Sequence, residues 1–371
     1  MNIHGRVVTP DGVLDSATVR LAGDRIADVS VGGGARPRRG DLGAAWIVPG
    51  FVDLHVHGGG GHTFTTGDAE QAHGAIAFHR SHGTTTMLAS LVTSSRRDTL
   101  DHAAALAPLV HSGELAGLHL EGPYLSTARC GAQNPAHLRD PDPGELADVI
   151  ATGVLRMMTV APELRGALPA IGTLRAHGVV AAVGHTDATY EQVLAAVEAG
   201  ATLATHLCNG MRPIHHRDPG PIVALLDSPG VVCEAVADGV HLHDGMLRHI
   251  VSAAGPARVA LVTDAMAAAG MPDGEYELGG LAVTVADGTA RLAADGTIAG
   301  STLTMAAALR RAVGAGVSIV DAVTMASASP ARVLGLAEEI GSVAPGRRAD
   351  LVLLDEKLGV ISVLRAGVAV A

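Results

Sequence analysis

The chain has 371 residues, of which 48% are hydrophobic and 17% charged, and its formal net charge is −11. Lys357 is the single lysine, and the arginines form no basic run, so neither nucleic acid nor an anionic membrane is expected as a partner. Aromatic residues make up only 2% of the chain, too few for the stacking platforms that bind single strands. An anionic substrate would therefore have to be held by a local arginine.

The N-terminal sequence and the cysteines indicate where the protein works. No long apolar run follows Met1, so we expect neither a signal peptide nor a membrane span. The three cysteines, Cys130, Cys208 and Cys233, show neither zinc-finger nor disulfide-framework spacing. Unpaired cysteines fit a reducing compartment, so we expect a cytoplasmic location.

Both ends of the chain have the pattern of short β-strands. Apolar and polar residues alternate between Pro and Gly turns over residues 1–45, and again over 350–355 and 359–370. Two β-rich ends that flank a long middle segment predict one small β-sandwich domain built from both termini, residues 1–45 and 340–371.

The middle of the chain, residues 46–339, alternates apolar runs with helical segments. The runs are too continuous for a half-exposed antiparallel sheet, and eight strand–helix units predict an α/β fold, a (β/α)₈ TIM-type barrel. An insertion at 274–299 has the pattern of further strands with turns. The eight runs are residues 46–56, 84–91, 115–120, 154–160, 179–183, 201–207, 231–236 and 259–263.

Titratable side chains stand where several of these runs end, which is the edge that carries the active site in such barrels. The first run ends with His55 and His57, which strand alternation places on one face. Glu121 ends the third run, and an ionised carboxylate is costly to bury unless something cationic meets it. A salt bridge to arginine, a metal ligand and a general base are the alternatives for Glu121. Three more runs end with His185, His206 and Asp264.

Four histidines and two carboxylates are thus expected at one mouth of the barrel. Imidazole nitrogens and carboxylate oxygens suit zinc and related divalent ions. The alternative for any one histidine is a hydrogen-bonded core residue, since the chain has 19 of them. For the whole set at five strand ends, a metal site is the better explanation.

Nine motifs in order resemble those of the N-acetylglucosamine-6-phosphate deacetylases, a family of the amidohydrolase superfamily, over nearly the whole chain. In many amidohydrolases a carboxylated lysine bridges two metals, but here the only lysine lies in the C-terminal β segment. The resemblance therefore makes Glu121 the anionic ligand. The motifs are PGFVDLHVH (49–57), HLEGPY (119–124), GAQNP (131–135), VGHT (183–186), THLCNGM (205–211), HHRDPG (215–220), ADGVH (237–241), LVTD (261–264) and IAGSTLTM (298–305).

The resemblance also implies residue roles. Glu121, His185 and His206 would hold the main metal ion, and His55 and His57 a second ion, which some members lack. One or two divalent ions per subunit are expected, zinc first, with Fe, Mn, Co or Ni as alternatives. Asp264 would be the catalytic acid/base. The positions implied for substrate binding are Ala132, Gln133, Asn209, Gly210, Arg217, His241, Ile298, Ala299 and Gly300.

The implied reaction is hydrolysis of the N-acetyl group of N-acetylglucosamine 6-phosphate, in amino-sugar catabolism. Alternatives are the same chemistry on N-acetylgalactosamine 6-phosphate, another amidohydrolase such as a deaminase, or a non-catalytic scaffold on this fold. The resemblance further implies a homodimer in which Arg217 completes the neighbouring site. Gln133 stands where many relatives carry histidine, and Cys130 is expected to be a free thiol on a lid loop over residues 126–134.

Overall fold

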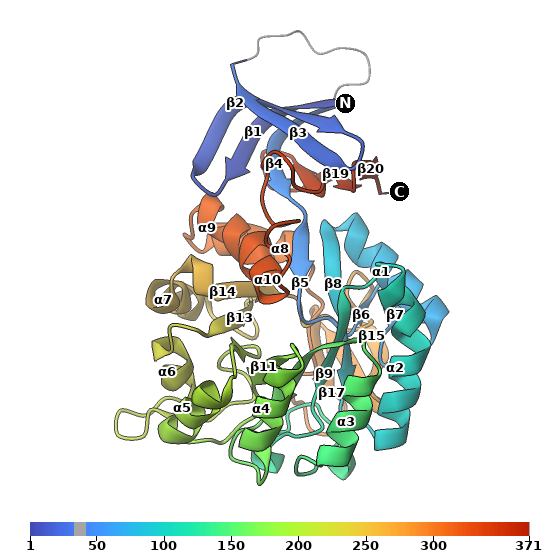
Figure 1. Ribbon diagram of the computed structural model, residues 1–371, viewed down its shortest axis with the longest axis vertical. Helices are drawn as coiled ribbons and strands as arrows, with labels where there is room; N and C mark the ends of the chain where they lie inside the picture. Colours follow the sequence, from blue (N-terminus) through green and yellow to red (C-terminus); the bar gives the residue numbers. More distant parts are fainter. Residues whose placement is uncertain (33–41, 371) are drawn as a thin grey trace.

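The computed structural model of the protein describes residues 1–32 and 42–370. Residues 33–41, which belong to the predicted N-terminal β segment, lie outside the described residues. A β-sheet made from both chain ends sits at one end of the molecule, and a ring of strands surrounded by helices forms the rest (Figure 1).

The barrel is a sheet of eight strands in which every neighbouring pair is parallel. The ring is closed where a parallel bridge joins Val56 to Ala265 and the amide of Asp264 donates to His55 O at 2.8 Å. Nearly all residues of these strands are buried, as is typical of a parallel sheet covered by helices. The predicted TIM-type barrel is confirmed. Its strands are β5 (Phe51–Asp53), β8 (Thr84–Val92), β9 (Gly117–Glu121), β10 (Leu155–Val160), β11 (Val180–Val183), β12 (Leu203–Ala204), β13 (Val232–Val236) and β14 (Val259–Val262).

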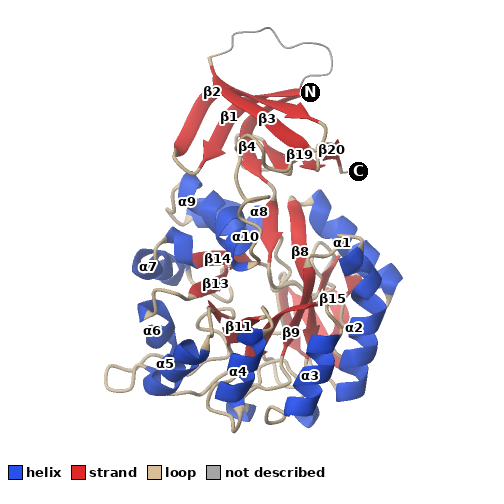
Figure 2. Cartoon of the chain, in the orientation of Figure 1, coloured by secondary structure: helices blue, strands red, loops and turns tan. Residues whose placement is uncertain are grey.

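Helices cover the outside of the barrel (Figure 2). Side chains fix where several begin: Asp68 accepts from two amides at the start of α1, and Thr189 forms a capping box with Gln192 at the start of α5. A π-helical turn (Thr324–Ala328) joins the last two helices. The helices are α1 (Ala69–Ser81), α2 (Arg96–His111), α3 (Pro143–Ala151), α4 (Ala167–Ala176), α5 (Tyr190–Ala199), α6 (Gly220–Asp227), α7 (Asp244–Ala254), α8 (Met305–Gly314), α9 (Ile319–Val323) and α10 (Ser329–Val333).

The second large sheet is built from both chain ends, as predicted, in the order β20-β19-β18-β4-β1-β2-β3. The run 46–56 was expected as one barrel strand, but the structure divides it: β4 pairs with β1 and β18, and only β5 joins the barrel. The break is at Gly50, directly after Pro49, the last residue of β4, which has no N–H to offer a ladder. Domain boundaries at 46 and 339 stay a prediction. The strands are β1 (Asn2–Thr9), β2 (Gly12–Ala22), β3 (Arg25–Val31), β4 (Leu42–Pro49), β18 (Leu351–Leu354), β19 (Val360–Arg365) and β20 (Val368–Ala369).

Two small β elements lie beside the barrel. The insertion forms the predicted strands, β15 (Gly274–Leu278), β16 (Leu281–Ala286) and β17 (Thr289–Leu292), which are antiparallel. They share a hydrophobic cluster with Met266 and Ala299, which follow β14 and β17. The insertion is thereby fixed against the segment after the eighth barrel strand. The other element is the hairpin β6 (Gly58–Gly59) and β7 (His62–Thr63).

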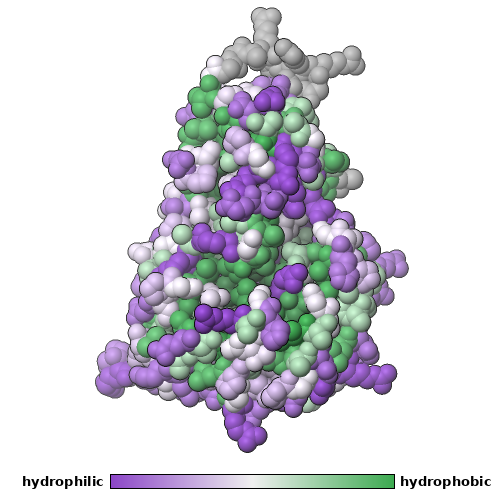
Figure 3. Space-filling view, in the orientation of Figure 1, coloured by the Kyte–Doolittle hydropathy of each residue, from purple (hydrophilic) through white to green (hydrophobic). Residues whose placement is uncertain are grey.

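The mixture of hydrophobic and hydrophilic residues on the surface is consistent with a chain of which only 17% is charged. On the face shown in Figure 3, hydrophobic residues lie in patches among hydrophilic ones over the barrel. In the described part of the chain, no helix has both the length and the apolar character needed to cross a bilayer.

Helix α1 holds the segment that follows the first barrel strand. His79 of α1 is fully buried, and its Nε2 lies 2.8 Å from Gly58 O. Because a carbonyl only accepts, the ring donates through Nε2. Burial lowers the pKa of His79 to about 4, so the ring stays neutral in the fold.

Acid should therefore weaken the fold through His79. The folded-state pKa of about 4 lies below the ordinary 6.5, so the unfolded chain binds a proton that the folded chain excludes. This stabilisation is complete above pH 6.5 and is lost as the pH falls towards 4. Between pH 7 and pH 5 the free energy of unfolding of wild type should fall by about 1–2 kcal/mol more than that of His79→Gln, whose amide still donates. Urea denaturation at both pH values measures this, and equal falls would contradict it.

Candidate metal-dependent active site

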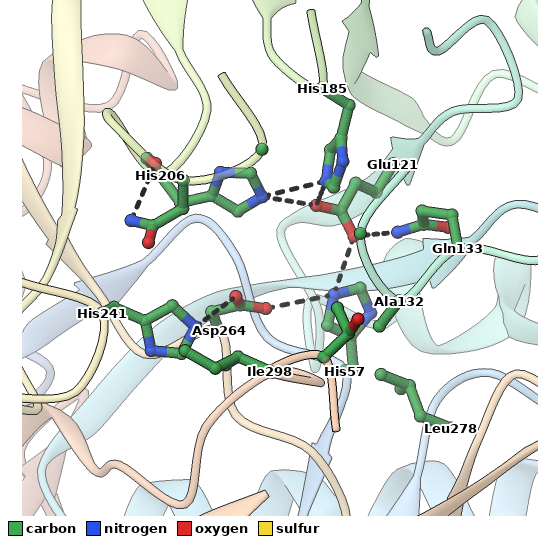
Figure 4. Close-up of a pocket in the computed structure, with 15 residues that line it drawn as sticks. His57, Glu121, Ala132, Gln133, His185, His206, His241, Asp264, Leu278 and Ile298 are labelled. Carbon is green, nitrogen blue, oxygen red and sulfur yellow. Dashed lines mark hydrogen bonds and ion pairs between the residues drawn. The ribbon is translucent and has the colours of Figure 1, made fainter. Parts of the chain in front are cut away.

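The ends of strands β9, β11, β12 and β14, with the segment after β5, meet at a cavity of about 250 Å³ (Figure 4). The cavity lies at the edge where barrel enzymes carry their chemistry. It is lined by His57, Glu121, Gly131, Ala132, Gln133, His185, His206, Asn209, Gly210, His241, Asp264, Leu278, Thr297, Ile298 and Gly300.

Glu121 is the centre of this cluster. It is the last residue of β9, and only 3% of it is exposed. Its Oε1 lies 3.0 Å from His185 Nε2 and 2.9 Å from His206 Nε2, and its Oε2 lies 3.2 Å from His57 Nε2. His55 Nε2 is 3.5 Å from the same Oε1. All four histidines thus point one ring nitrogen at a single carboxylate.

Two groups of side chains in the described residues could each hold a metal ion, and Glu121 belongs to both. One group joins it to His55 and His57, the other to His185 and His206, and within each the ligand atoms lie within 4.8 Å of one another. Every member is buried. A shared carboxylate between two histidine pairs is the arrangement expected of a bridging ligand.

The hydrogen bonds of the rings test whether a cation fits. His57 Nδ1 lies 3.1 Å from Ser90 O and His185 Nδ1 lies 2.9 Å from Arg129 O, so both donate through Nδ1 and keep a lone pair on Nε2. The Nε2 atoms of His185 and His206 are 3.1 Å apart, as are those of His55 and His57. Where these nitrogens carry lone pairs, they repel each other and the nearby carboxylate unless a positive charge lies among them. An ion with zinc–nitrogen bonds of about 2.0–2.1 Å suits such pairs.

The pKa shifts show the same preference for positive charge. Burial lowers the pKa of His57, but hydrogen bonds to Asp264 and Glu121 outweigh it and raise the pKa to about 8. Burial likewise opposes the shift at His55, where the carboxylates of Glu121, Asp264 and Glu234 raise the pKa well above its ordinary value. Burial raises the pKa of Glu121, yet His55 and the other rings bring it well below its usual range. The cluster therefore attracts either protons or a metal ion.

Three of these residues have strained backbones. His185, His206 and Asp264 have φ values of 46°, 26° and 50°, in the left-handed region that side-chain-bearing residues rarely adopt. Each stands two residues after the end of its barrel strand. Such strain persists where the surrounding structure enforces it, and it concentrates at functional sites.

Asp264 and His241 form the opposite wall of the cavity (Figure 4). Asp264 Oδ1 lies 3.4 Å from His57 Nε2, and its Oδ2 lies 3.9 Å from His241 Nε2. Asp238 Oδ2 accepts from His241 Nδ1 at 2.6 Å. Burial lowers the pKa of His241, but the bond to Asp238 reverses this and raises the pKa overall. His241 is thereby held with Nε2 towards Asp264.

The loop over residues 126–134 closes one side of the cavity. Ala132 and Gln133 both line it, as the resemblance implied. The Gln133 side chain is largely engaged within the protein: Nε2 donates to Glu121 Oε2 at 2.6 Å, and Oε1 accepts from Thr93 N at 2.7 Å. Cys130 is a half-buried free thiol on this loop.

Not every predicted residue reaches the cavity. Asn209, Gly210, His241, Ile298 and Gly300 line it, whereas His55 and Ala299 are completely buried behind its surface. Arg217 is exposed and does not line the cavity of its own chain. Its guanidinium instead lies 2.8 Å from the neighbouring His216 Nε2.

Five residues of the site were missed: Gly131, Leu278 and Thr297, which line the cavity, and Asp238 and Glu234, which contact His241 and His55. Asp238 lies in the ADGVH motif, three residues before His241, and that spacing is the one signal that could have found it. Glu234 ends no run and Leu278 comes from the insertion, so neither position stands out in the sequence.

Comparison with known proteins agrees with this geometry. The sequence profile of the amidohydrolase family matches residues 46–370. An N-acetylglucosamine-6-phosphate deacetylase of Lysinibacillus sphaericus is 36% identical over 87% of this chain and 84% of its own length. An N-acetylgalactosamine-6-phosphate deacetylase of Escherichia coli O157:H7 is 37% identical over 96% and 95%.

A solved structure is more similar still. It is a mutant N-acetyl-D-glucosamine-6-phosphate deacetylase from Mycobacterium smegmatis in complex with N-acetyl-D-glucosamine-6-phosphate. It has 48% sequence identity and a TM-score of 0.97, covering 100% of this chain and 99% of its own. The chain therefore belongs to the amidohydrolase family and, within it, to the N-acetylglucosamine-6-phosphate deacetylases.

Proposed function

We propose that the chain hydrolyses the N-acetyl group of N-acetylglucosamine 6-phosphate, giving glucosamine 6-phosphate and acetate. The observation that carries this is the Asp264 carboxylate, which faces the Glu121–histidine cluster on an open cavity, with Oδ1 3.4 Å from His57 Nε2. An acid/base beside a cation site is an arrangement that can hydrolyse an unactivated amide. The 48% identical relative that binds this sugar phosphate supports the choice of substrate.

The proposed metal ligands are Glu121, His185 and His206 for the main ion, and His55 and His57, with Glu121 shared, for a second. Zinc suits these nitrogen and oxygen donors, and Fe, Mn, Co and Ni accept similar ones. A bound ion supplies Lewis acidity towards the acetyl carbonyl and the attacking water. The Nδ1 bonds of His57 and His185 keep their Nε2 atoms free to bind it.

The remaining steps belong to the protein's own groups. Asp264 is proposed to take a proton from the attacking water and to return it to the departing amine nitrogen. Burial raises the pKa of Asp264, but His55 and His57 lower it overall, so the carboxylate is ionised and ready to accept that proton. Against the effect of burial, the bond to Asp238 raises the pKa of His241 and so favours its protonated form, which is placed to donate from Nε2 to the acetyl oxygen as negative charge develops there.

The phosphate needs a cation that this cavity does not supply. Among the described residues that line it, none is arginine or lysine. Arg217 is exposed on its loop, three residues from Ile214, an isoleucine that is 44% exposed. We infer a homodimer in the cytoplasm in which Arg217 of one subunit reaches the phosphate bound to the other.

The same reaction on N-acetylgalactosamine 6-phosphate is the second candidate. It is favoured by the 37% identity with the E. coli enzyme named for that substrate. The two sugars differ at one hydroxyl, and an assay of both decides between them.

Acetate release from the two sugar phosphates by the zinc-loaded enzyme tests the function, with Asp264→Asn as the inactive control. An amide keeps the shape of Asp264 but cannot take a proton, so kcat should fall by about 10²–10⁴-fold while zinc content is kept. Wild-type enzyme that releases no acetate from either sugar would refute the function. A variant with more than half the wild-type kcat would refute the role of Asp264.

Removing Glu121 should disturb metal binding more than removing His55 and His57 together. Glu121 belongs to both ligand groups, whereas the two histidines belong to one. Glu121→Ala should lose both ions, and the double His55→Ala/His57→Ala variant should keep the main one. Zinc content after equilibrium dialysis measures this, and a Glu121→Ala variant with full zinc content would contradict the assignment.

Arg217→Ala should lose about 10–150-fold in kcat/KM on the 6-phosphate, since a charged hydrogen bond contributes about 1.5–3 kcal/mol. Activity on unphosphorylated N-acetylglucosamine should hardly change, and equal losses on both sugars would refute the phosphate role.

Mixing Arg217→Ala with Asp264→Asn tests the dimer. In a mixed dimer one site combines an intact Asp264 with an intact Arg217 from the other subunit, so activity on the 6-phosphate should reappear.

A further inference from the structure

Glu234 is a buried carboxylate behind the proposed metal site. It lies on β13 and is 0% exposed. Its Oε2 accepts from His206 N at 3.0 Å and from His55 Nδ1 at 3.1 Å, while its Oε1 is buried without a hydrogen-bond partner among the described residues. A charge buried with half of its acceptor capacity unused is costly. Its place in the fold therefore calls for a reason other than stability.

The two bonds of Oε2 have different consequences. The bond from the His206 backbone fixes where the carboxylate lies. The bond from His55 fixes the ring, because a carboxylate that accepts from Nδ1 leaves Nε2 facing Glu121 and Asp264. The rings of His57 and His185 are held by backbone carbonyls, so among the four histidines His55 alone has a side-chain carboxylate behind it.

We propose that Glu234 is a positioning residue that selects the metal-binding tautomer of His55 and strengthens that ring as a ligand. Partial transfer of negative charge through Nδ1–H makes Nε2 a better donor to a metal ion, an effect that a neutral carbonyl gives more weakly. Glu234 thereby raises the affinity of the His55–His57–Glu121 group for an ion. The inference rests on the metal ligands of the proposed function.

Zinc affinity, measured by competition with a chromophoric chelator, provides the test. Loss of a partner behind a metal-binding histidine typically costs 10–100-fold in affinity, so Glu234→Ala should weaken the ion held by His55 by that factor. Glu234→Gln should lose less, since its carbonyl oxygen can still accept from Nδ1. Glu145→Gln is the matched control: Glu145 is also buried, but it pairs with Arg139 and does not line the cavity, so zinc affinity should be unchanged.

The same substitution made in a His55→Ala chain shows whether Glu234 acts by positioning His55 or by a general effect on the fold. If Glu234 acts through His55, Glu234→Ala should have almost no further effect on zinc affinity in a His55→Ala chain. A Glu234→Ala protein with wild-type zinc affinity, or an equal loss in both backgrounds, would overturn the inference. Should the alanine variant not fold, Glu234→Gln carries the same comparison, and wild-type affinity there would also overturn it.

The same titrations distinguish this inference from the proposed function. Wild-type protein that binds no zinc would refute the proposed metal site itself. Wild-type zinc affinity that does not depend on His55 would overturn the role of Glu234 while leaving the main site at Glu121, His185 and His206 intact.

Discussion

The arrangement of the site depends on Glu121, a buried carboxylate whose negative charge must be balanced by positive charge nearby. Four imidazole nitrogens lie close to the buried carboxylate of Glu121, which water cannot solvate, and the Asp264 carboxylate lies close to two of the same rings, His55 and His57. The neighbouring carboxylates raise the pKa values of His55 and His57 despite their burial, so positive charge is favoured at these two rings. The surrounding hydrogen bonds make sense as a consequence, because each orients a ring so that a cation, and not a proton, is the best occupant.

The barrel brings these histidines and carboxylates together, because segments that are distant in the sequence reach the same edge of the sheet. Parallel strands all end on the same side, so residues far apart in the chain arrive there as neighbours. The positions of the strand ends alone do not determine how these side chains are oriented. The left-handed backbone at His185, His206 and Asp264 turns these residues back over the barrel mouth, and the packed strands below hold that strain in place.

The sequence predicts what depends on local periodicity. Strand alternation places His55 and His57 on one face, and Glu121 ends a buried run, so the barrel and its ring of site residues could be predicted. It does not predict contacts that depend on side-chain rotamers across the fold. Glu234 meets His55 across 179 positions, and no spacing marks that pair. The division of the first run between two sheets was also missed, since an apolar run looks the same whether its partners come from one sheet or two.

The loop over residues 126–134 connects the wall of the cavity to the proposed metal ligands. Its Arg129 carbonyl accepts from His185 Nδ1, and its Gln133 amide donates to Glu121 Oε2, so the loop contacts two of the three ligands proposed for the main ion. The same loop places Ala132 and Gln133 on the cavity wall. Because one loop both lines the cavity and bonds to His185 and Glu121, a change in its position would also change how these two side chains are oriented.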